Sequence, residues 1–416
     1  MSVSRRRFIR DGVTAFTVSV AAPSFLSDIA RAQGAASRNL VVLYLSGGND
    51  SLNTVVPYSD PFYYSRRPNI AIPTGQVLQI GSDSSGKTRG FHPSLAGLHS
   101  IFNEGRLAVV QRTGYANSSR SHFQGLDIWG TADPGSPSGI GWLGRYLDTL
   151  GPSNPLTAWT TTRETPRALV SRTVGVPAIP DARNYSFSSP NTGTAALDER
   201  SAATQMASHQ PAGRPELAFV NSASAGALGT LDLVASVASY TGTTTYPNNG
   251  LGSALRTVAG SIVRGVGTRI FWVSTGGFDT HAGQGDAGGG AYANLMSTFN
   301  GAVLAFYTDM RNQGLLNSTM LVQFSEFGRR VTENGSRGTD HGSAASMMVI
   351  GGSVRGGLYG TAPSLDPASP TLENNGTDVR FETAVRSVYA RVLDGWLGAD
   401  SLSILDGDFR NGPAFL

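Results

Sequence analysis

The stretch RIFWVSTGGFDTH, residues 269–281, joins a run of apolar residues to a loop of potential metal ligands. The same design recurs in TMLVQFSEFGRR, residues 319–330, and the loop TDHGS (339–343) leads into a further apolar run, SMMVI (346–350). Short continuous apolar runs are typical of strands buried in a parallel sheet. In an open α/β sheet, ligands bind outside the carboxyl ends of the strands, so we expect these loops to converge on one crevice.

Two earlier apolar runs, at residues 39–45 and 107–112, are also expected to form buried strands. Helical patterns occur between the runs, at about 92–104, 251–264 and 291–313. Strands that alternate with helices favour a parallel sheet that is covered on both faces. The sequence therefore predicts an α/β fold of three layers, with a doubly wound, mostly parallel sheet.

Residues 130–250 interrupt this alternation and are expected to form an irregular insertion, because Gly, Pro, Ser and Thr are dense in their first half. Helix-compatible stretches follow at about 196–212 and 222–238. Near the C-terminus, residues 378–397 carry apolar side chains at helical spacing, which predicts a helix packed on the core. These apolar side chains are Phe381, Val385, Val388, Tyr389, Val392 and Trp396.

The first residues carry the features of an export signal. SRRRFIR (4–10) matches the twin-arginine pattern, a weakly hydrophobic stretch follows at 13–26, and ARA (30–32) supplies a cleavage site. The alternative is an amphipathic helix, but the order of charge, apolar stretch and cleavage site favours a signal. We expect residues 1–32 to be a twin-arginine signal peptide and residues 33–416 to form a single domain, exported folded to the periplasm or secreted.

Removal of this signal leaves no net charge. The signal holds five arginines and two aspartates, so 27 basic and 27 acidic residues remain of the 32 and 29 in the whole chain. We therefore expect no nucleic-acid partner. Cysteine is absent, so a metal would be bound by histidine or carboxylate. The apolar runs of the mature part are short, so we expect no transmembrane anchor there.

The loops after the predicted strands hold acids beside histidines. Asp279 and His281 follow two glycines, Glu326 ends another strand, and His341 lies next to Asp340. Imidazole with carboxylate suits zinc, manganese or iron, whereas an all-oxygen site suits calcium or magnesium. The alternative is a set of solvated loop acids, paired with neighbouring arginines. The joint occurrence favours a divalent metal, whose identity the sequence leaves open.

The loop NSSRSH, residues 117–122, places three serines before a predicted helix. A helix N-terminus stabilises an anion, so a phosphate or sulfate could bind there. A serine hydroxyl in this place could also act as a nucleophile beside a metal. The alternative is simple N-capping of the helix, which serine performs routinely.

Several ordered motifs together resemble one exported bacterial family, the domain of unknown function 1501. These motifs are SGGNDSLN (46–53), NSSRSHF (117–123), GFDTH (277–281), SEFGR (325–329) and DHG (340–342). The resemblance covers nearly the whole mature chain. More distantly, that family is similar to the alkaline phosphatase and sulfatase superfamily, which has a doubly wound sheet and usually two metal ions.

The superfamily resemblance implies metal ligands at specific positions. Asp279, His281 and His341 correspond to ligands of one metal ion. Glu326 and Asp50 correspond to contributors to a second. The chain departs from the superfamily pattern after its first strand, where it has Ser-Gly instead of Asp, and at Glu-Phe (326–327), where Asp-His is common. The resemblance therefore implies one or two ions.

The same resemblance implies a nucleophile at the start of a helix. Ser121 is the candidate because it adjoins His122, and Ser118 is the second choice. Arg120 or Arg329 would bind the anion of the substrate. The absence of cysteine excludes a formylglycine derived from it.

We thus expect an exported metal-dependent hydrolase of phosphate or sulfate esters, acting on a small-molecule or glycan-linked anionic ester. The alternative from another class is a non-catalytic exported protein that keeps this fold for binding or assembly, with a second exported protein as its partner. Redox chemistry at a His/carboxylate iron site is a third hypothesis, because the ligand types alone do not exclude it.

Overall fold

The computed structural model describes residues 38–151, 156–209, 211–285 and 289–416. The predicted signal peptide, residues 1–32, lies outside the described residues.

A central sheet of eight strands forms the middle layer, in the order β10-β5-β9-β8-β1-β7-β6, with β13 beside β5. The strands are β1 (Asn39–Leu45), β5 (Leu107–Gly114), β6 (Ala158–Thr160), β7 (Ile270–Thr275), β8 (Thr319–Phe324), β9 (Ala345–Gly351), β10 (Gly357–Tyr359) and β13 (Thr383–Ala384). Two small sheets lie apart from it: β2 (Val55–Val56), β4 (Thr88–Phe91) and β3 (Leu78–Ser82) in one, and β11 (Leu372–Glu373) and β12 (Asp378–Val379) in the other.

Most strands of the central sheet are parallel to their neighbours. β1 pairs in parallel with β7 and β8, β6 with β7, and β10 and β13 with β5. β9 alone runs antiparallel to both of its neighbours, β5 and β8. The predicted mostly parallel sheet is confirmed, and the reversal of β9 is new. It places the loop before β9 at the sheet edge where β8 ends.

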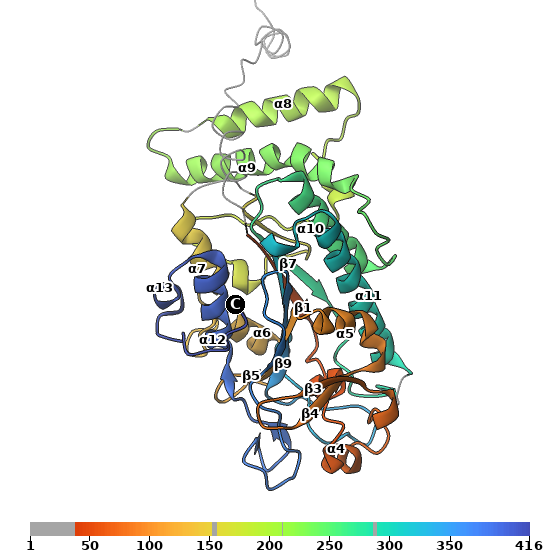
Figure 1. Cartoon of the computed structure of the whole chain (residues 1–416). Coiled ribbons are helices and arrows are strands. Elements are labelled where there is room, and N and C mark those ends of the chain that lie inside the picture. The colour runs from red at the N-terminus through yellow and green to blue at the C-terminus, as the bar shows by residue number, and fades with distance from the viewer. Residues whose placement is uncertain (1–37, 152–155, 210, 286–288) are drawn as a thin grey trace, which may run out of the picture.

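The two faces of the sheet bury alternate side chains. In β1, Val41, Leu43 and Leu45 belong to one core, which includes side chains of α5, α10 and α11. Leu40, Val42 and Tyr44 belong to the other core, with side chains of α6, α7 and α12. Figure 1 shows these helix groups on opposite sides of the sheet. The predicted three layers are therefore confirmed.

The helices are α3 (Ser51–Thr54), α4 (Pro61–Arg66), α5 (Ala96–Asn103), α6 (His122–Thr131), α7 (Trp142–Leu150), α8 (Thr194–Ser208), α9 (Pro215–Ala238), α10 (Gly250–Arg264), α11 (Ala291–Asn312), α12 (Val385–Arg391) and α13 (Ser401–Leu405). Short 3₁₀ turns are η1 (Thr74–Gln76), η2 (Pro93–Leu95), η3 (Arg167–Leu169), η4 (Ala182–Asn184) and η5 (Leu316–Ser318), and a π-helical turn, η6 (Val392–Leu397), continues α12.

The region expected to be an irregular insertion, 130–250, contains regular elements. It adds β6 to the edge of the central sheet and α7 to one of the cores. Its two later helices, α8 and α9, pack on one another at one end of the molecule (Figure 1). α9 is the one described helix that is long and apolar enough, by length and composition, to cross a membrane. Leu231, Val234 and Val237 in its last turns are buried, whereas Leu217 and Val220 near its start are exposed.

The predicted C-terminal helix begins later than expected. Residues 378–384 contain β12 and β13, and the helix starts at Val385. Phe381 therefore lies outside the helix, although its spacing fits the apolar stripe. Val385, Val388 and Trp396 are buried in the core as expected.

Candidate metal centre

Loops from four separate places in the chain meet at the carboxyl edge of the sheet. They follow β1, β5, β7 and β8, and the last of them returns into β9. Gly47, after β1, packs so closely on the loop after β7 that a Cβ atom there would overlap the backbone nitrogen of Asp279. With a φ of +122°, this position also requires glycine. The close approach brings the acidic and histidine side chains of these loops together.

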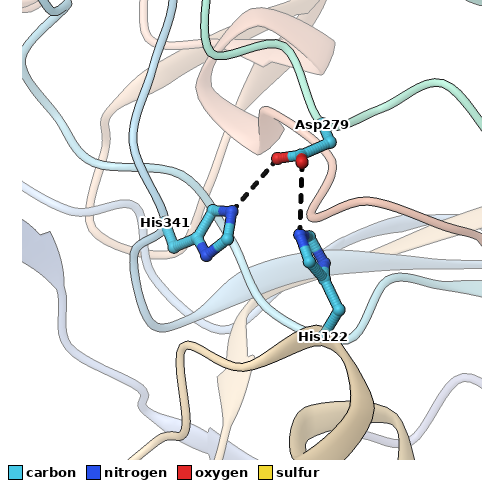
Figure 2. Close-up of side chains that lie close together, drawn as sticks. All are labelled: His122, Asp279 and His341. Carbon is cyan, nitrogen blue, oxygen red and sulfur yellow. Dashed lines mark hydrogen bonds and ion pairs between the residues drawn. The ribbon is translucent and has the colours of Figure 1, made fainter.

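His122 enters the cluster from the first turn of α6. The preceding residue, Ser121, caps this helix by accepting a hydrogen bond from the backbone N–H of Gln124 at 3.5 Å. The Nδ1 atom of His122 lies 2.7 Å from Oε1 of Glu326. Its Nε2 atom points at Asp279, 3.4 Å from Oδ2 (Figure 2). This Nε2 atom is buried and has no hydrogen bond with any described residue.

His341 and His281 approach the same carboxylate from two other loops. Nε2 of each ring lies 3.1 Å from Oδ1 of Asp279, and the two Nε2 atoms are 2.8 Å apart. The ring centroids of His122 and His341 are 4.4 Å apart. Three imidazoles thus surround one carboxylate, and His122, Asp279 and His341 offer ligand atoms that all lie within 4.8 Å of one another.

The hydrogen-bond partners of the three Nδ1 atoms determine which ring nitrogens carry lone pairs. Nδ1 of His122 faces the Glu326 carboxylate, Nδ1 of His341 lies 2.7 Å from the backbone oxygen of Arg120, and Nδ1 of His281 lies 3.3 Å from Oδ1 of Asp340. Each partner is an acceptor, so each Nδ1 carries the proton in the neutral ring. The three Nε2 lone pairs then converge on a carboxylate, which is also an acceptor. Only added protons or a cation relieve the repulsion among them.

The cluster fits a first-row metal ion. A tetrahedral ion with ligands at about 2.0–2.1 Å holds its ligand atoms about 3.3 Å apart. The Nε2–carboxylate separations of 3.1 and 3.4 Å are close to this spacing. A carboxylate, a carbonyl or another acceptor behind each ligating imidazole is the usual outer partner in such sites. Among the described residues, His122, Asp279 and His341 are the group with this donor arrangement.

Asp279 is held in its charged form. Partial burial raises its pKa, but the paired Arg329 guanidinium and the adjoining His341 and His281 rings outweigh burial and lower the pKa to about 2. Arg329 is buried beneath this carboxylate and pairs with it. The side chain of Asp279 is half-exposed, so the cluster is open to solvent at the surface.

Glu326, a predicted contributor to a second metal ion, lies against His122. Its side chain is fully buried behind His122. Oε1 accepts the backbone N–H of Gly47 at 2.9 Å as well as the His122 ring, and Oε2 accepts the Ser325 hydroxyl at 2.9 Å. Both oxygens are therefore engaged, and Glu326 orients an imidazole.

Asp50 is the other residue predicted to contribute to a second ion. It lies in a buried ion pair, with Oδ2 2.7 Å from Nη1 of Arg67 and 2.7 Å from Nε2 of Gln284. Both charged side chains are inaccessible to solvent. The superfamily resemblance implied this Asp as a ligand, whereas in the structure it pairs with Arg67, seventeen residues later. The Oδ1 atom of Asp50 is buried without a hydrogen-bond partner among the described residues, and the number of metal ions stays a prediction of one or two.

The two arginines expected to bind substrate are both occupied. Arg329 donates to the backbone oxygens of Gly48 and Thr339 at 2.7 Å each, so it ties loops together beneath the site. Arg120 is partly exposed, but its guanidinium pairs with the buried Asp378. Its contribution to the cluster is its backbone oxygen, which holds His341.

The candidate nucleophiles lie beside the cluster, at the start of α6. Ser121 is exposed and caps the helix, as the alternative interpretation of this loop predicted. Ser118 hydrogen-bonds to the Tyr115 hydroxyl. Among the described residues, no hydrogen bond joins either hydroxyl to the histidine cluster, so the nucleophile stays a prediction.

Sequence reasoning missed two roles at this site. The sequence predicts His122 as a catalytic residue beside Ser121, whereas in the structure its ring lies with Asp279 and His341. Asp340 was noted beside His341, whereas it contacts His281. A hydrogen bond from Asn334 lowers the pKa of Asp340 and keeps it an acceptor for that ring. The one available signal was the presence of three histidines in three loops at the same sheet edge.

Comparison with known proteins identifies the family. A family model described as "Protein of unknown function (DUF1501)" matches residues 37–379. The chain belongs to this family. The resemblance seen in the sequence motifs is thereby confirmed. A search of curated protein sequences gave no match.

Solved structures give distant likenesses. The C-terminal periplasmic domain of EcEptC from Escherichia coli, in complex with Zn, is 11% identical, covers 86% of this chain and 84% of that one, and has a TM-score of 0.39. The PsFucS1 sulfatase from Pseudoalteromonas sp. is 13% identical, with coverage of 94% and 71% and a TM-score of 0.34. The lipoteichoic acid synthase LtaP from Listeria monocytogenes is 8% identical, with coverage of 79% and 67% and a TM-score of 0.25. All three TM-scores lie below 0.5, so the description of the fold rests on the strand order of this protein alone.

Proposed function

We propose that this protein is an exported metal-dependent hydrolase of phosphate or sulfate esters. The observation that carries the proposal is the set of three imidazoles whose Nδ1 atoms are held by Glu326, Arg120 and Asp340. Their Nε2 atoms converge on the Asp279 carboxylate. Side chains oriented in this way from separate loops are a preorganised ligand set.

A divalent metal bound here would polarise an ester oxygen and lower the pKa of a water or hydroxyl. The residues around it would bind and orient an anionic ester. α6 starts at His122, so the free N–H groups of its first turn lie next to the cluster and favour negative charge. Ser121, the candidate nucleophile, is exposed at the same helix start.

Metal content and turnover test this proposal together. Purified protein is analysed for bound metal and then assayed on 4-nitrophenyl phosphate, bis(4-nitrophenyl) phosphate and 4-nitrophenyl sulfate. We expect at least one ester to be hydrolysed, with the activity lost on chelation. Asp279→Asn and His341→Gln should abolish activity while the protein remains folded. His99→Gln is the matched control, because His99 contacts a backbone oxygen of Gln79 on the surface.

Three outcomes of this experiment distinguish the proposed function from its alternatives. Hydrolysis that depends on Asp279 and His341 supports the proposal. Metal binding without hydrolysis of any of the three esters would favour the non-catalytic alternative. Absence of metal after reloading with zinc, manganese or iron would remove the basis of the proposed mechanism.

The export route has its own test. Replacement of Arg5 and Arg6 by lysine should trap the precursor in the cytoplasm, because the twin-arginine pair is the recognised feature of this signal. Immunoblots of periplasmic and cytoplasmic fractions would measure the distribution. Unchanged export of the Arg5→Lys, Arg6→Lys variant would argue against this route.

A further inference from the structure

A buried glutamine lies directly behind the two loops that carry His281 and His341. Gln284 has no exposed surface. Its Oε1 atom accepts the hydroxyl of Thr280 at 2.8 Å and the hydroxyl of Thr339 at 3.1 Å. Its Nε2 atom donates to Oδ2 of Asp50 at 2.7 Å.

The charge of Asp50 determines which way this amide points. A carboxylate accepts hydrogen bonds only, so the NH₂ group of Gln284 must face it. The carbonyl oxygen must then face the two threonines, and both hydroxyls must donate to it. Asp50 is itself fixed by Arg67, whose other nitrogens donate to the backbone oxygens of Arg330 and Val331 at 2.8 Å each. The buried ion pair thus sets the direction of every bond in this network.

The two threonines transmit this arrangement to the metal centre. Thr280 lies between Asp279 and His281, and Thr339 lies two residues before His341. The backbone N–H of Thr339 also donates to the backbone oxygen of Thr280 at 3.0 Å. One oxygen atom shared by both loops therefore fixes their register, on which the 2.8 Å spacing of the two histidine Nε2 atoms depends.

We propose that Gln284 is a positioning residue of the metal centre, which sets the spacing of the loops that carry Asp279, His281 and His341. This inference rests on the metal-binding part of the proposed function. Gln284 touches none of the metal-binding side chains, and it acts through Thr280 and Thr339. The loops are held before metal binds, so loss of the shared oxygen loosens the site and weakens metal affinity.

The test compares two buried glutamines, each replaced by methionine. Gln284→Met keeps the length of the side chain and removes the shared acceptor, while Asp50 keeps its bond to Arg67. Gln111→Met is the control, because Gln111 is also buried and bonds to an arginine and an aspartate, Arg89 and Asp83, which belong to another network. Zn²⁺ affinity is measured by calorimetry, and stability of the metal-free protein by urea unfolding.

We expect Gln284→Met to raise the Kd for Zn²⁺ about tenfold, as substitutions behind metal ligands do. Gln111→Met should lower stability without changing this Kd. Equal zinc affinity of Gln284→Met and the wild type would overturn the inference and leave the proposed function intact. Failure of the wild type itself to bind Zn²⁺ would instead contradict the metal centre.

A second pair of variants gives the answer if Gln284→Met does not fold. Thr339→Val removes one hydroxyl from the network, whereas Thr339→Ser keeps it at the same place. We expect zinc affinity to fall in the valine variant and to be retained in the serine variant. Equal zinc affinity of the two variants would overturn the inference, because it would show that the hydroxyl of Thr339 does not affect metal binding.

Discussion

Glu326→Gln is the most informative single substitution at the site. The glutamine has the same shape as the glutamate, and its Oε1 can still accept from the Gly47 N–H and the His122 ring. Its NH₂ group would replace Oε2, which accepts from the Ser325 hydroxyl. That hydroxyl can donate to the backbone oxygen of Leu45 instead, 2.7 Å away. The substitution therefore removes a charge and keeps the acceptor for the Gly47 N–H and the His122 ring in place.

The expected loss lies in metal affinity. A carboxylate behind an imidazole raises the basicity of the inner nitrogen, and loss of such a partner weakens metal binding about 10- to 100-fold. This range corresponds to about 1.4–2.8 kcal/mol of binding free energy. Glu326 is fully buried and lies 2.7 Å from Nδ1 of His122, so solvent screens little of its effect.

Competition with a zinc-binding dye measures this affinity. Asp309→Asn is the matched control, since Asp309 is equally buried and accepts hydrogen bonds from Tyr240, Thr243 and Tyr246 away from the metal centre. The control should lose about 1–3 kcal/mol of folding stability and keep its zinc affinity. If Glu326→Gln binds zinc as tightly as the wild type, the carboxylate does not act through His122, and the reasoning is refuted.

Three further substitutions test how the loops are held. Arg67→Met leaves Asp50 buried without its partner and should destabilise the protein by about 3–5 kcal/mol in urea unfolding, so a loss below about 1 kcal/mol would contradict this role. Gly47→Ala places a Cβ atom against the backbone of Asp279 at a φ of +122°. This variant should have a lower melting temperature and a lower zinc affinity than the wild type. A melting curve equal to that of the wild type would contradict the predicted overlap. Burial lowers the pKa of His92 to about 4 from 6.5, so the unfolded chain binds more protons between these values and stability falls as the pH drops through this window. His92→Asn should reduce that pH dependence, and an unchanged slope would argue against a buried neutral ring.

Five strands of the central sheet, β1, β5, β7, β8 and β9, were predictable because each is a continuous apolar run, whereas the short strands β6, β10 and β13 were not predicted. Residues 39–45, 269–274 and 319–324 bury both faces of the sheet, so the hydrophobic pattern alone marks them. The direction of β9 was not predictable, because a central antiparallel strand is as apolar as a parallel one. The C-terminal helix was predicted to start too early because Phe381 lies four residues before Val385, a spacing that fits a helix although α12 begins only at Val385.

The place of the site was predictable, but the roles within it were only partly so. Asp279, His281 and His341 follow or precede strands, so topology alone brings them to one edge. A buried glutamate beside a strand end has the same sequence pattern whether it binds a metal or orients a histidine, so the sequence alone did not reveal the contact of Glu326 with His122. The ion pair of Asp50 was not predictable, because Arg67 comes from a segment whose path the sequence does not determine.

X-ray absorption at the zinc edge, on protein loaded with one equivalent of Zn²⁺, tests the central claim most directly. The account predicts a first shell that contains imidazole nitrogens at about 2.0–2.1 Å, with a carboxylate oxygen from Asp279. The outer-shell scattering of imidazole should decrease in His341→Gln and remain unchanged in His99→Gln. A first shell of oxygen atoms alone, or a spectrum that is the same in both variants, would contradict the assignment of these histidines as metal ligands.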